Sequence, residues 1–307
     1  MRAVRCAIVL LLVFTSWGEA CLASGAAPLV KVAPIEIFQG EIKEIKISGV
    51  ELTTLDAQLG KKTIRFYPLE DKAYAALVGI DLESKPGTVK VVVKGAIKDG
   101  LRRDIQIPIH VKTKSFQQES FSVPPQFDDL GTSELERIRS EQQELDRVFA
   151  VLTPERMWER PFIAPVSSEI TSPFGYRRII NGAPRAPHTG VDLRAALGTP
   201  VLASNNGRVA LTGDFFFSGN TLVLDHGGGL YTMYFHLSEF NKREGDDVYK
   251  GEVIGLSGMT GRVTGPHLHW GARINGARVD PFELIEKVIA KDQTASGGGA
   301  NAGTKEK

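Results

Sequence analysis

"TGPHLHWG" (residues 264–271) places two histidines, His267 and His269, one residue apart within a short apolar run. In a β-strand, side chains two residues apart point to the same face, with Cα atoms roughly 6.6 Å apart. Both imidazoles would therefore face one cleft, while Leu268 and Trp270 would pack on the opposite face. Two neutral imidazoles at this spacing can bind one metal ion together, or one can bind while the other reaches a substrate. Spacing alone leaves both alternatives open.

A second candidate metal motif lies upstream in "PHTGVDL" (residues 187–193), where His188 and Asp192 are four residues apart. Pro187 and Gly190 argue against a helix here, and in a straight strand the two side chains would be about 13 Å apart. The chain must therefore bend or bulge, which Gly190 permits. An imidazole and a carboxylate would then converge on a metal, with a histidine of the first motif as third ligand. Two histidines and one carboxylate, with a fourth position open to water, are the composition of a catalytic zinc site.

A zinc site of this kind needs a proton carrier. Zinc lowers the pKa of a bound water to about 7 and polarises a carbonyl, but proton transfer requires a further group within hydrogen-bond reach, and histidine titrates in the right range. The candidates are His236, in "YFHLS", and whichever histidine of the first motif is not a ligand. This set predicts hydrolysis of an amide. We interpret His226, in "DHGGG", as a turn residue rather than a ligand.

Composition narrows the function classes. The chain has 307 residues, 42% of them hydrophobic, which is enough for two modest domains. Its formal net charge of +1 gives no electrostatic case for nucleic acid or an anionic membrane surface as the main partner. The 32 glycines favour a turn-rich, largely β architecture. Of the two cysteines, Cys6 lies in a predicted leader, so an intrachain disulfide and thiolate metal ligands are both excluded from the mature chain.

The first 26 residues resemble a secretory signal peptide. Arg2 and Arg5 precede an apolar run at residues 6–14 that is too short to span a bilayer, and small residues follow it. We therefore expect export to the periplasm or cell envelope. Cys21 raises the alternative of a lipoprotein, but the residues before it lack the apolar position of a lipidation motif, which disfavours that reading.

The rest of the chain divides by pattern. Residues 29–114 alternate apolar and polar positions between turn signals, which predicts an antiparallel, sandwich-like β domain of unassigned role. Residues 115–159 predict a linker that contains an amphipathic helix at about 133–152. Residues 160–288 return to short, glycine-dense strands and predict an antiparallel β domain. The polar, glycine-rich residues 291–307 predict a disordered tail. The fold class is thus mainly β.

Two features of the first 159 residues have competing interpretations. Ser133 and Glu136 form a capping-box pattern at the start of the predicted helix. We expect that helix to pack between the two domains, although a regulatory helix covering an active site is the alternative. His110 lies in a predicted strand between Ile109 and Val111, which indicates a structural or solvent-facing role.

Four stretches between about Thr171 and Pro281 resemble the M23 peptidase family, the lysostaphin/LytM-type zinc endopeptidases. They are "SPFGYRR", "PHTGVDLRAALGTPVLASNNGRV", "GNTLVLDHGGGLYTMYFHLS" and "GEVIGLSGMTGRVTGPHLHWGARINGARVDP". The resemblance implies a small antiparallel β fold with a long groove and one Zn²⁺ per catalytic domain. It implies that His188, Asp192 and His269 are the zinc ligands. It also implies that His236 and His267 are the catalytic pair that orients the water, moves protons and stabilises the tetrahedral intermediate.

The resemblance further implies the substrate, namely the stem peptides or cross-bridges of bacterial cell-wall peptidoglycan. The alternative is a non-catalytic LytM-type regulator that activates cell-wall amidases, but such domains have lost ligands and all five histidine and aspartate positions are present here. The N-terminal domain or the helix could contact an envelope regulator. Arg177 and Arg178 could meet carboxylates on stem peptides, or could be plain surface charges.

Overall fold

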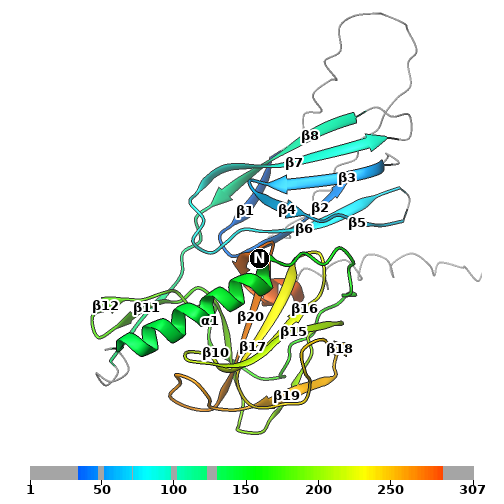
Figure 1. Cartoon of the computed structure of the whole chain (residues 1–307). Helices are drawn as coiled ribbons and strands as arrows, with labels where there is room; N and C mark the ends of the chain where they lie inside the picture. The colour runs from blue at the N-terminus through cyan, green and yellow to red at the C-terminus, as the bar shows by residue number, and fades with distance from the viewer. Residues whose placement is uncertain (1–33, 48–51, 71, 98–101, 123–129, 286–307) are drawn as a thin grey trace, which may run out of the picture.

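The computed structural model describes residues 34–47, 52–70, 72–97, 102–122 and 130–285. The predicted signal peptide (1–26) and the predicted tail (291–307) lie outside these described residues. The described chain is mainly β, as the sequence predicts, with N-terminal sheets above and a larger C-terminal sheet below in Figure 1. Among the described residues, no helix is both long enough and apolar enough to cross a membrane.

The N-terminal strands form two sheets that pack face to face. The strands are β1 (Ile35–Phe38), β2 (Ile42–Ile47), β3 (Leu52–Leu59), β4 (Lys62–Ile64), β5 (Tyr67–Pro68), β6 (Tyr74–Gly79), β7 (Gly87–Ile97) and β8 (Arg102–Lys112). One sheet has the order β1-β8-β7-β3-β4 and the other β2-β6-β5. The pairing is antiparallel except between β1 and β8, which run parallel. Alternate residues such as Val91, Val93 and Ile107 are buried between the sheets because a strand turns successive side chains to opposite faces.

The C-terminal sheet is large, antiparallel and continuous across the metal motifs. Its strands are β10 (Ile170–Ser172), β13 (Gly190–Arg194), β14 (Pro200–Leu202), β15 (Gly207–Phe215), β16 (Gly219–Asp225), β17 (Leu230–Phe240), β18 (Asp247–Val248), β19 (Val253–Ser257), β20 (His267–Ile274) and β21 (Ala277–Val279). The main order is β10-β13-β20-β17-β16-β15-β18. Leu268 and Trp270 alternate with the two histidines of β20 and are fully buried in the core, as the two-residue period predicts.

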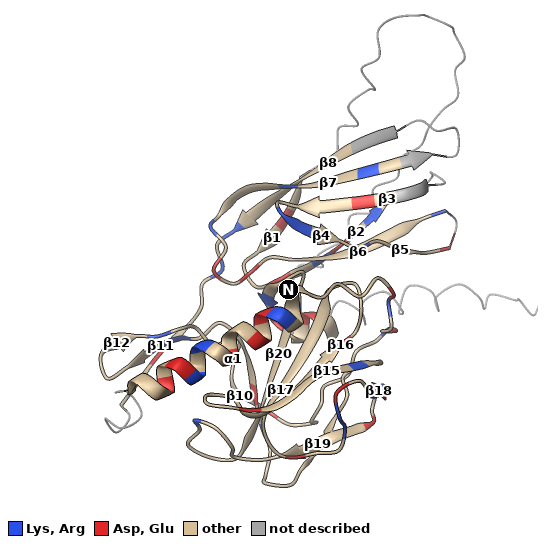
Figure 2. Cartoon of the chain, in the orientation of Figure 1, with Lys and Arg blue, Asp and Glu red and all other residues tan. Residues whose placement is uncertain are grey.

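The helix α1 (Thr132–Ala150) lies against the C-terminal sheet. Leu145, Val148 and Phe149 pack on an apolar group from β15, β16 and β17, and the Phe149 and Tyr231 rings meet edge to face. Figure 2 shows acidic and basic residues interspersed along the helix. The predicted capping box is wrong: Gly131 is the N-cap residue, and the Ser133 hydroxyl donates to Glu134 instead. The helix begins one residue before Ser133, which moves that side chain out of the capping position.

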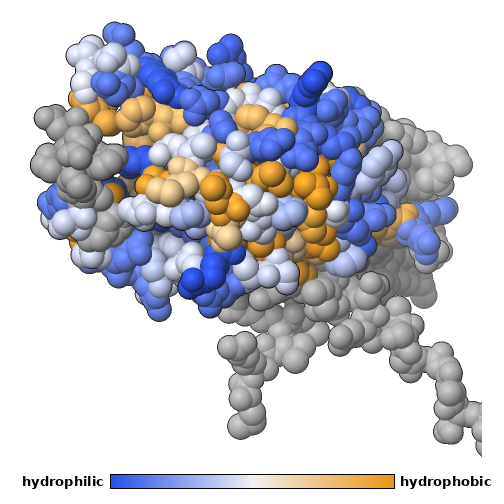
Figure 3. Space-filling view, turned by 90° about the horizontal axis from the view of Figure 1, so that it is seen from below, coloured by the Kyte–Doolittle hydropathy of each residue, from blue (hydrophilic) through white to orange (hydrophobic). Residues whose placement is uncertain are grey.

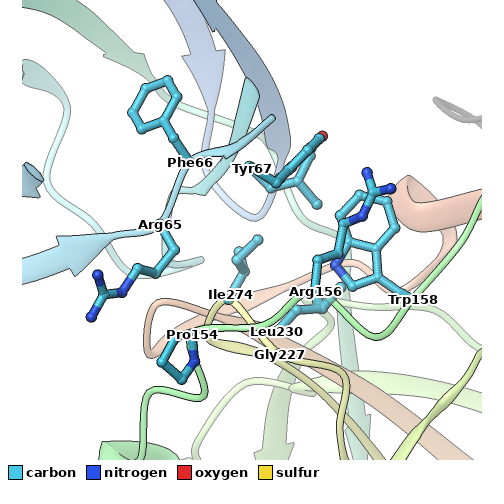
Figure 4. A pocket seen from close by; sticks show the side chains of 11 residues that line it. Arg65, Phe66, Tyr67, Pro154, Arg156, Trp158, Gly227, Leu230 and Ile274 are labelled. Atoms are coloured by element: carbon cyan, nitrogen blue, oxygen red, sulfur yellow. The ribbon is translucent and has the colours of Figure 1, made fainter. Parts of the chain in front are cut away.

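Polar and aromatic contacts join the N-terminal sheets to the C-terminal sheet. Arg278 of β21 donates two hydrogen bonds to the Asp81 carboxylate, at 2.9 and 2.7 Å. Nearby, the Arg156 guanidinium carbon lies 4.5 Å from the ring centre of Tyr67 and 4.9 Å from that of Trp158. Figure 4 shows this stack at the edge of a pocket between the two parts of the molecule. The cation–π contacts and the bidentate ion pair hold the two parts in a defined arrangement.

Candidate metal centre and active site

Strand pairing brings the two metal motifs together. In the antiparallel pair β13–β20, Asp192 lies directly opposite His269. Asp192 Oδ1 is 2.9 Å from His269 Nδ1 and 3.0 Å from His188 Nε2, and the two imidazole nitrogens are 3.0 Å apart. All three residues are buried, with exposed fractions of 2% to 9%. The three residues therefore offer ligand atoms to a single point.

His188 reaches this point because it precedes β13 rather than belonging to it. Its backbone N–H donates to Tyr176 O, and its carbonyl accepts from Gly175 N–H, so it is tied to the segment between β10 and β11 (Arg177–Ile180). The expected convergence of His188 and Asp192 is present, but Gly190 contributes differently from our prediction. It is the first residue of β13, and a Cβ there would lie 2.5 Å from His269 Nε2 and from Trp270 O. Glycine allows the close approach of the two strands at the ligands.

The donor set fits a divalent metal ion. His188 Nδ1 donates to Pro173 O at 2.9 Å, and a carbonyl can only accept, so the neutral ring has its lone pair on Nε2. That lone pair faces Asp192 Oδ1, an arrangement that a cation between the two atoms stabilises. Ligand atoms about 2.0–2.2 Å from a tetrahedral zinc ion would lie roughly 3.3–3.6 Å apart, close to the separations observed. The site therefore needs only a small adjustment to hold zinc.

The protonation of the ligands agrees with metal binding. Burial by itself raises the pKa of Asp192, but the close contacts with His188 and His269 outweigh burial and hold that pKa far below its usual range. Burial lowers the pKa of His269 to about 4, so its ring is neutral at pH 7. The Phe235 ring stacks on the His269 ring, with centres 4.9 Å apart and planes 6° from parallel. His269 and Asp192 thus present a neutral and an anionic donor in fixed orientations.

His236 and His267 lie together beside the three candidate ligands. Their ring centres are 4.8 Å apart, and His267 Nε2 is 3.8 Å from Asp192 Oδ1. His236 Nδ1 donates to Thr260 O and His267 Nδ1 donates to Gly265 O, both at 2.9 Å. Because a carbonyl fixes the proton on Nδ1 in each case, Nε2 is the atom that can exchange a proton with a ligand or substrate. Burial, followed by the nearby His269 and His267, lowers the pKa of His236 to about 3.

The backbone at His236 is unusual for a residue with a side chain. Its φ of 64° lies in the left-handed region, where a non-glycine residue costs of order 1–3 kcal/mol. Its N–H donates to Ser218 O, and its ring is held by Thr260 O, so two neighbouring loops maintain this conformation. Strained residues of this kind cluster at active sites. Sequence reasoning missed Thr260 and Phe235, because neither occupies a position in a ligand motif.

Two further histidines lie elsewhere. His226 is in the turn between β16 and β17, as expected, but it is fully buried, which the sequence did not indicate. Its Nδ1 lies 2.7 Å from Asn206 O and its Nε2 lies 2.7 Å from Thr232 Oγ1. His110 lies on β8, where its Nδ1 is 3.0 Å from Thr88 Oγ1. Neither residue is among those that contact the metal ligands.

Two curated proteins match the C-terminal part of the chain. The DD-carboxypeptidase/endopeptidase Mpg of Neisseria meningitidis serogroup B is 47% identical over 119 residues, which cover 39% of this chain and 27% of that protein. The peptidoglycan DD-endopeptidase ShyA of Vibrio cholerae is 44% identical over 122 residues, which cover 39% of this chain and 28% of that protein. The chain thus spans less than a third of the length of these relatives.

A family model and a solved structure extend the similarity. The model of peptidase family M23 matches residues 186–281, which include all three metal-ligand candidates. A crystal structure of a putative M23 peptidase from Pseudomonas aeruginosa is 30% identical, with a TM-score of 0.61. That match covers 80% of this chain and 93% of the Pseudomonas chain, so it includes the N-terminal sheets as well. The chain belongs to peptidase family M23.

Proposed function

We propose that this chain is a zinc metalloendopeptidase that hydrolyses the peptide cross-links of bacterial cell-wall peptidoglycan. The main support is the convergence of three buried ligand atoms beside two histidines whose Nε2 atoms are available for proton exchange. The printed functions of Mpg and ShyA support peptidoglycan peptides as the substrate class. Such a substrate requires action in the cell envelope, which agrees with the predicted signal peptide.

In this proposal, His188 Nε2, Asp192 Oδ1 and His269 Nδ1 hold the zinc ion. Bound zinc supplies a lowered pKa for a water molecule and polarisation of the scissile carbonyl. His236 and His267 supply the proton transfers. Each neutral ring presents an Nε2 lone pair, so it can take a proton from the water as the amide carbon is attacked and return it to the leaving nitrogen.

The two rings can also stabilise the negative charge that develops on the oxyanion. A ring that has accepted a proton is an imidazolium with Nε2–H directed away from its carbonyl anchor, and it can donate to the oxyanion of the tetrahedral intermediate. The anchors at Thr260 O and Gly265 O keep both rings in the orientation that this exchange requires. Burial of His236 favours rapid return of its proton, because its charged form is disfavoured.

Incubation of the purified chain with isolated peptidoglycan tests the function. We expect zinc-dependent release of peptide-containing fragments, loss of release after chelation, and recovery when zinc is added back. Mass spectrometry of the fragments identifies the scissile bond. His110→Ala is the matched control because it removes a histidine outside the site, and it should leave both zinc content and fragment release unchanged.

The regulator alternative gives a different result in the same experiment. A zinc-loaded chain that releases no peptide fragment, but increases glycan–peptide cleavage by a separately added amidase, would replace the peptidase proposal with the regulatory one. Fragment release that survives complete removal of zinc would contradict the metal-dependent mechanism itself.

A further inference from the structure

The linker between the two parts of the molecule is built into the wall of the metal site. Its strand β9 (Gln118–Phe121) pairs in parallel with β11 (Arg177–Ile180), and β12 (Ala183–Pro184) completes this small sheet. Arg177 N–H donates to Gln117 O at 2.8 Å, and the Tyr176 hydroxyl donates to the Gln117 side chain at 2.5 Å. The sequence predicts only an extended connection here. The linker is instead hydrogen-bonded to the segment that leads to His188.

A chain of charges runs from β9 to the metal ligands. Glu119 lies opposite Arg178 in the β9–β11 register, and Arg178 Nε donates to Glu119 Oε1 at 3.1 Å. Arg178 Nη2 lies 3.6 Å from Asp192 Oδ2, while the other oxygen, Oδ1, faces His188 and His269. Arg178 therefore contacts the outer oxygen of a metal ligand. The sequence alone did not indicate such a contact within the chain for Arg178.

The positive charge of Arg178 makes its partner, Glu119, important for cation binding at Asp192. A guanidinium beside Asp192 holds the carboxylate in place, but its positive charge also opposes a divalent cation bound to the same carboxylate. Glu119 balances that charge and fixes the guanidinium by a charge-assisted hydrogen bond. The Glu119 and Arg178 side chains are about one-third exposed, so we expect their pairing to add little to folding stability.

The linker also supports the backbone that orients His188. The Phe116 ring packs edge to face on Phe174, with centres 6.1 Å apart. It also lies so close to Gly175 that a Cβ there would be 2.1 Å from it. On the other side of the same segment, Pro173 O accepts the His188 Nδ1 proton and Tyr176 O accepts the His188 backbone N–H. Residues 173–176 thus lie between the linker and a metal ligand.

We propose that β9 contributes to zinc affinity at the metal site. In this proposal Glu119 is a positioning residue that acts through Arg178 on Asp192. The inference rests on the metal binding in the proposed function and goes beyond it, because it assigns a role in zinc affinity to a residue outside the matched family region. Outer-shell partners of metal ligands typically change metal affinity or activity by about 10–100-fold. Because Glu119 contacts Arg178 rather than the ligand itself, we expect a change in zinc affinity at the lower end of that range.

The test measures zinc affinity of the full chain by competition with a chelator, together with the visible absorption spectrum of the cobalt-substituted protein. Glu119→Gln should raise the zinc Kd about tenfold and alter the cobalt spectrum, with an unchanged thermal unfolding midpoint. Asp247→Asn is the matched control: it removes the carboxylate of another exposed pair, with Arg208, on the far edge of the sheet. That control should bind zinc as the wild type does.

A second background shows whether Glu119 acts through Arg178. In Arg178→Gln, the further change Glu119→Gln should leave zinc affinity unaltered, because the intermediary is gone. A Kd for Glu119→Gln within twofold of wild type, or an equal loss in both backgrounds, would overturn the inference. Zinc binding with no peptidoglycan cleavage by the wild type would contradict only the proposed function. The two failures are therefore distinguishable.

Discussion

Two groups of histidines lie in the C-terminal part of the chain, and they differ in what the second ring nitrogen contacts. In the first group, His226 has a partner at each nitrogen, the Asn206 carbonyl and the Thr232 hydroxyl. In the second, His236 and His267 each use Nδ1 on a backbone carbonyl and keep Nε2 for exchange. The comparison indicates that burial alone does not mark a functional histidine. What marks one is a fixed ring with an available nitrogen.

The His226 group is a closed network that stabilises the fold. The Thr232 hydroxyl lies 2.9 Å from the Tyr234 hydroxyl, which in turn donates to Ser204 Oγ at 2.9 Å. All of these side chains are fully buried, so each hydrogen bond replaces one that water would otherwise make. The candidate metal centre also buries polar side chains, but their ligand atoms converge on one point that a cation can occupy.

The largest expected effect is the loss of a ligand. His269→Ala removes one of three metal donors and leaves a void beside Phe235, so we expect zinc affinity to fall by more than the roughly 10–100-fold typical of an outer-shell partner. Zinc content after dialysis, measured by atomic emission together with peptidoglycan cleavage, checks this. If the variant keeps stoichiometric zinc, His269 is not a metal ligand and its role is structural, like that of His226.

Removing a proton carrier should separate turnover from metal binding. His236→Gln should retain zinc and lose about 10²–10⁴-fold in turnover, the range for a general acid or base. Single-turnover rates on isolated peptidoglycan, beside zinc analysis of the same sample, give both numbers. Loss of zinc in this variant would place His236 among the metal ligands. Metal binding and proton transfer would then not be divided between different histidines.

The His226 group should make the free energy of unfolding depend on pH. Burial lowers the pKa of His226 to about 4, below its ordinary value of 6.5, so the neutral ring stabilises the fold above pH 6.5. That stabilisation, about 3 kcal/mol at most, is lost as the pH falls from 6.5 through 4. Urea unfolding of the zinc-free chain at several pH values should show it. His226→Gln should reduce the pH dependence of stability in this window without abolishing it, because the lowered pKa values of His236 and His269 act in the same window in the zinc-free chain. An unchanged slope would contradict the assignment.

The smallest expected effect is the loss of stability when the Thr232 hydroxyl, which joins His226 to Tyr234, is removed. Thr232→Val keeps the shape of the side chain but leaves His226 Nε2 and the Tyr234 hydroxyl without this partner. We expect a loss of about 1–3 kcal/mol in the free energy of unfolding, with zinc affinity unchanged. Equilibrium unfolding and chelator competition measure the two quantities. A large change in zinc affinity would mean that the two groups are coupled through the sheet.

Much of this arrangement is predictable from sequence, because it depends on local patterns. The two-residue period of β20 predicts that His267 and His269 share a face, while Leu268 and Trp270 are buried opposite them. The need for His188 and Asp192 to converge follows from their spacing and is met. Their assignment as ligands, and that of His236 and His267 as catalytic residues, depends on the family resemblance and stays a prediction.

The remaining features depend on partners far away in the chain. The sequence around His226 indicates a turn, but the burial of its ring depends on Asn206, Thr232 and the Phe162 ring, which all lie elsewhere in the sequence. Strand β9 is four residues long, and its pairing with β11 is set by the docking of Phe116 on Phe174 rather than by its own composition. Figure 3 shows hydrophobic residues near the middle of the face seen from below, among hydrophilic ones.

Histidine side-chain NMR of the ¹⁵N-labelled chain tests the division of the histidines most directly, by comparing ring nitrogen shifts before and after one equivalent of zinc. We predict that His188 Nε2 and His269 Nδ1 move to metal-bound values, while His236 and His267 keep their protons on Nδ1. His226 should remain neutral, with both nitrogens unchanged. Zinc-induced changes at the His226 nitrogens, or metal-bound shifts at His236 or His267 in place of His188 or His269, would contradict the account.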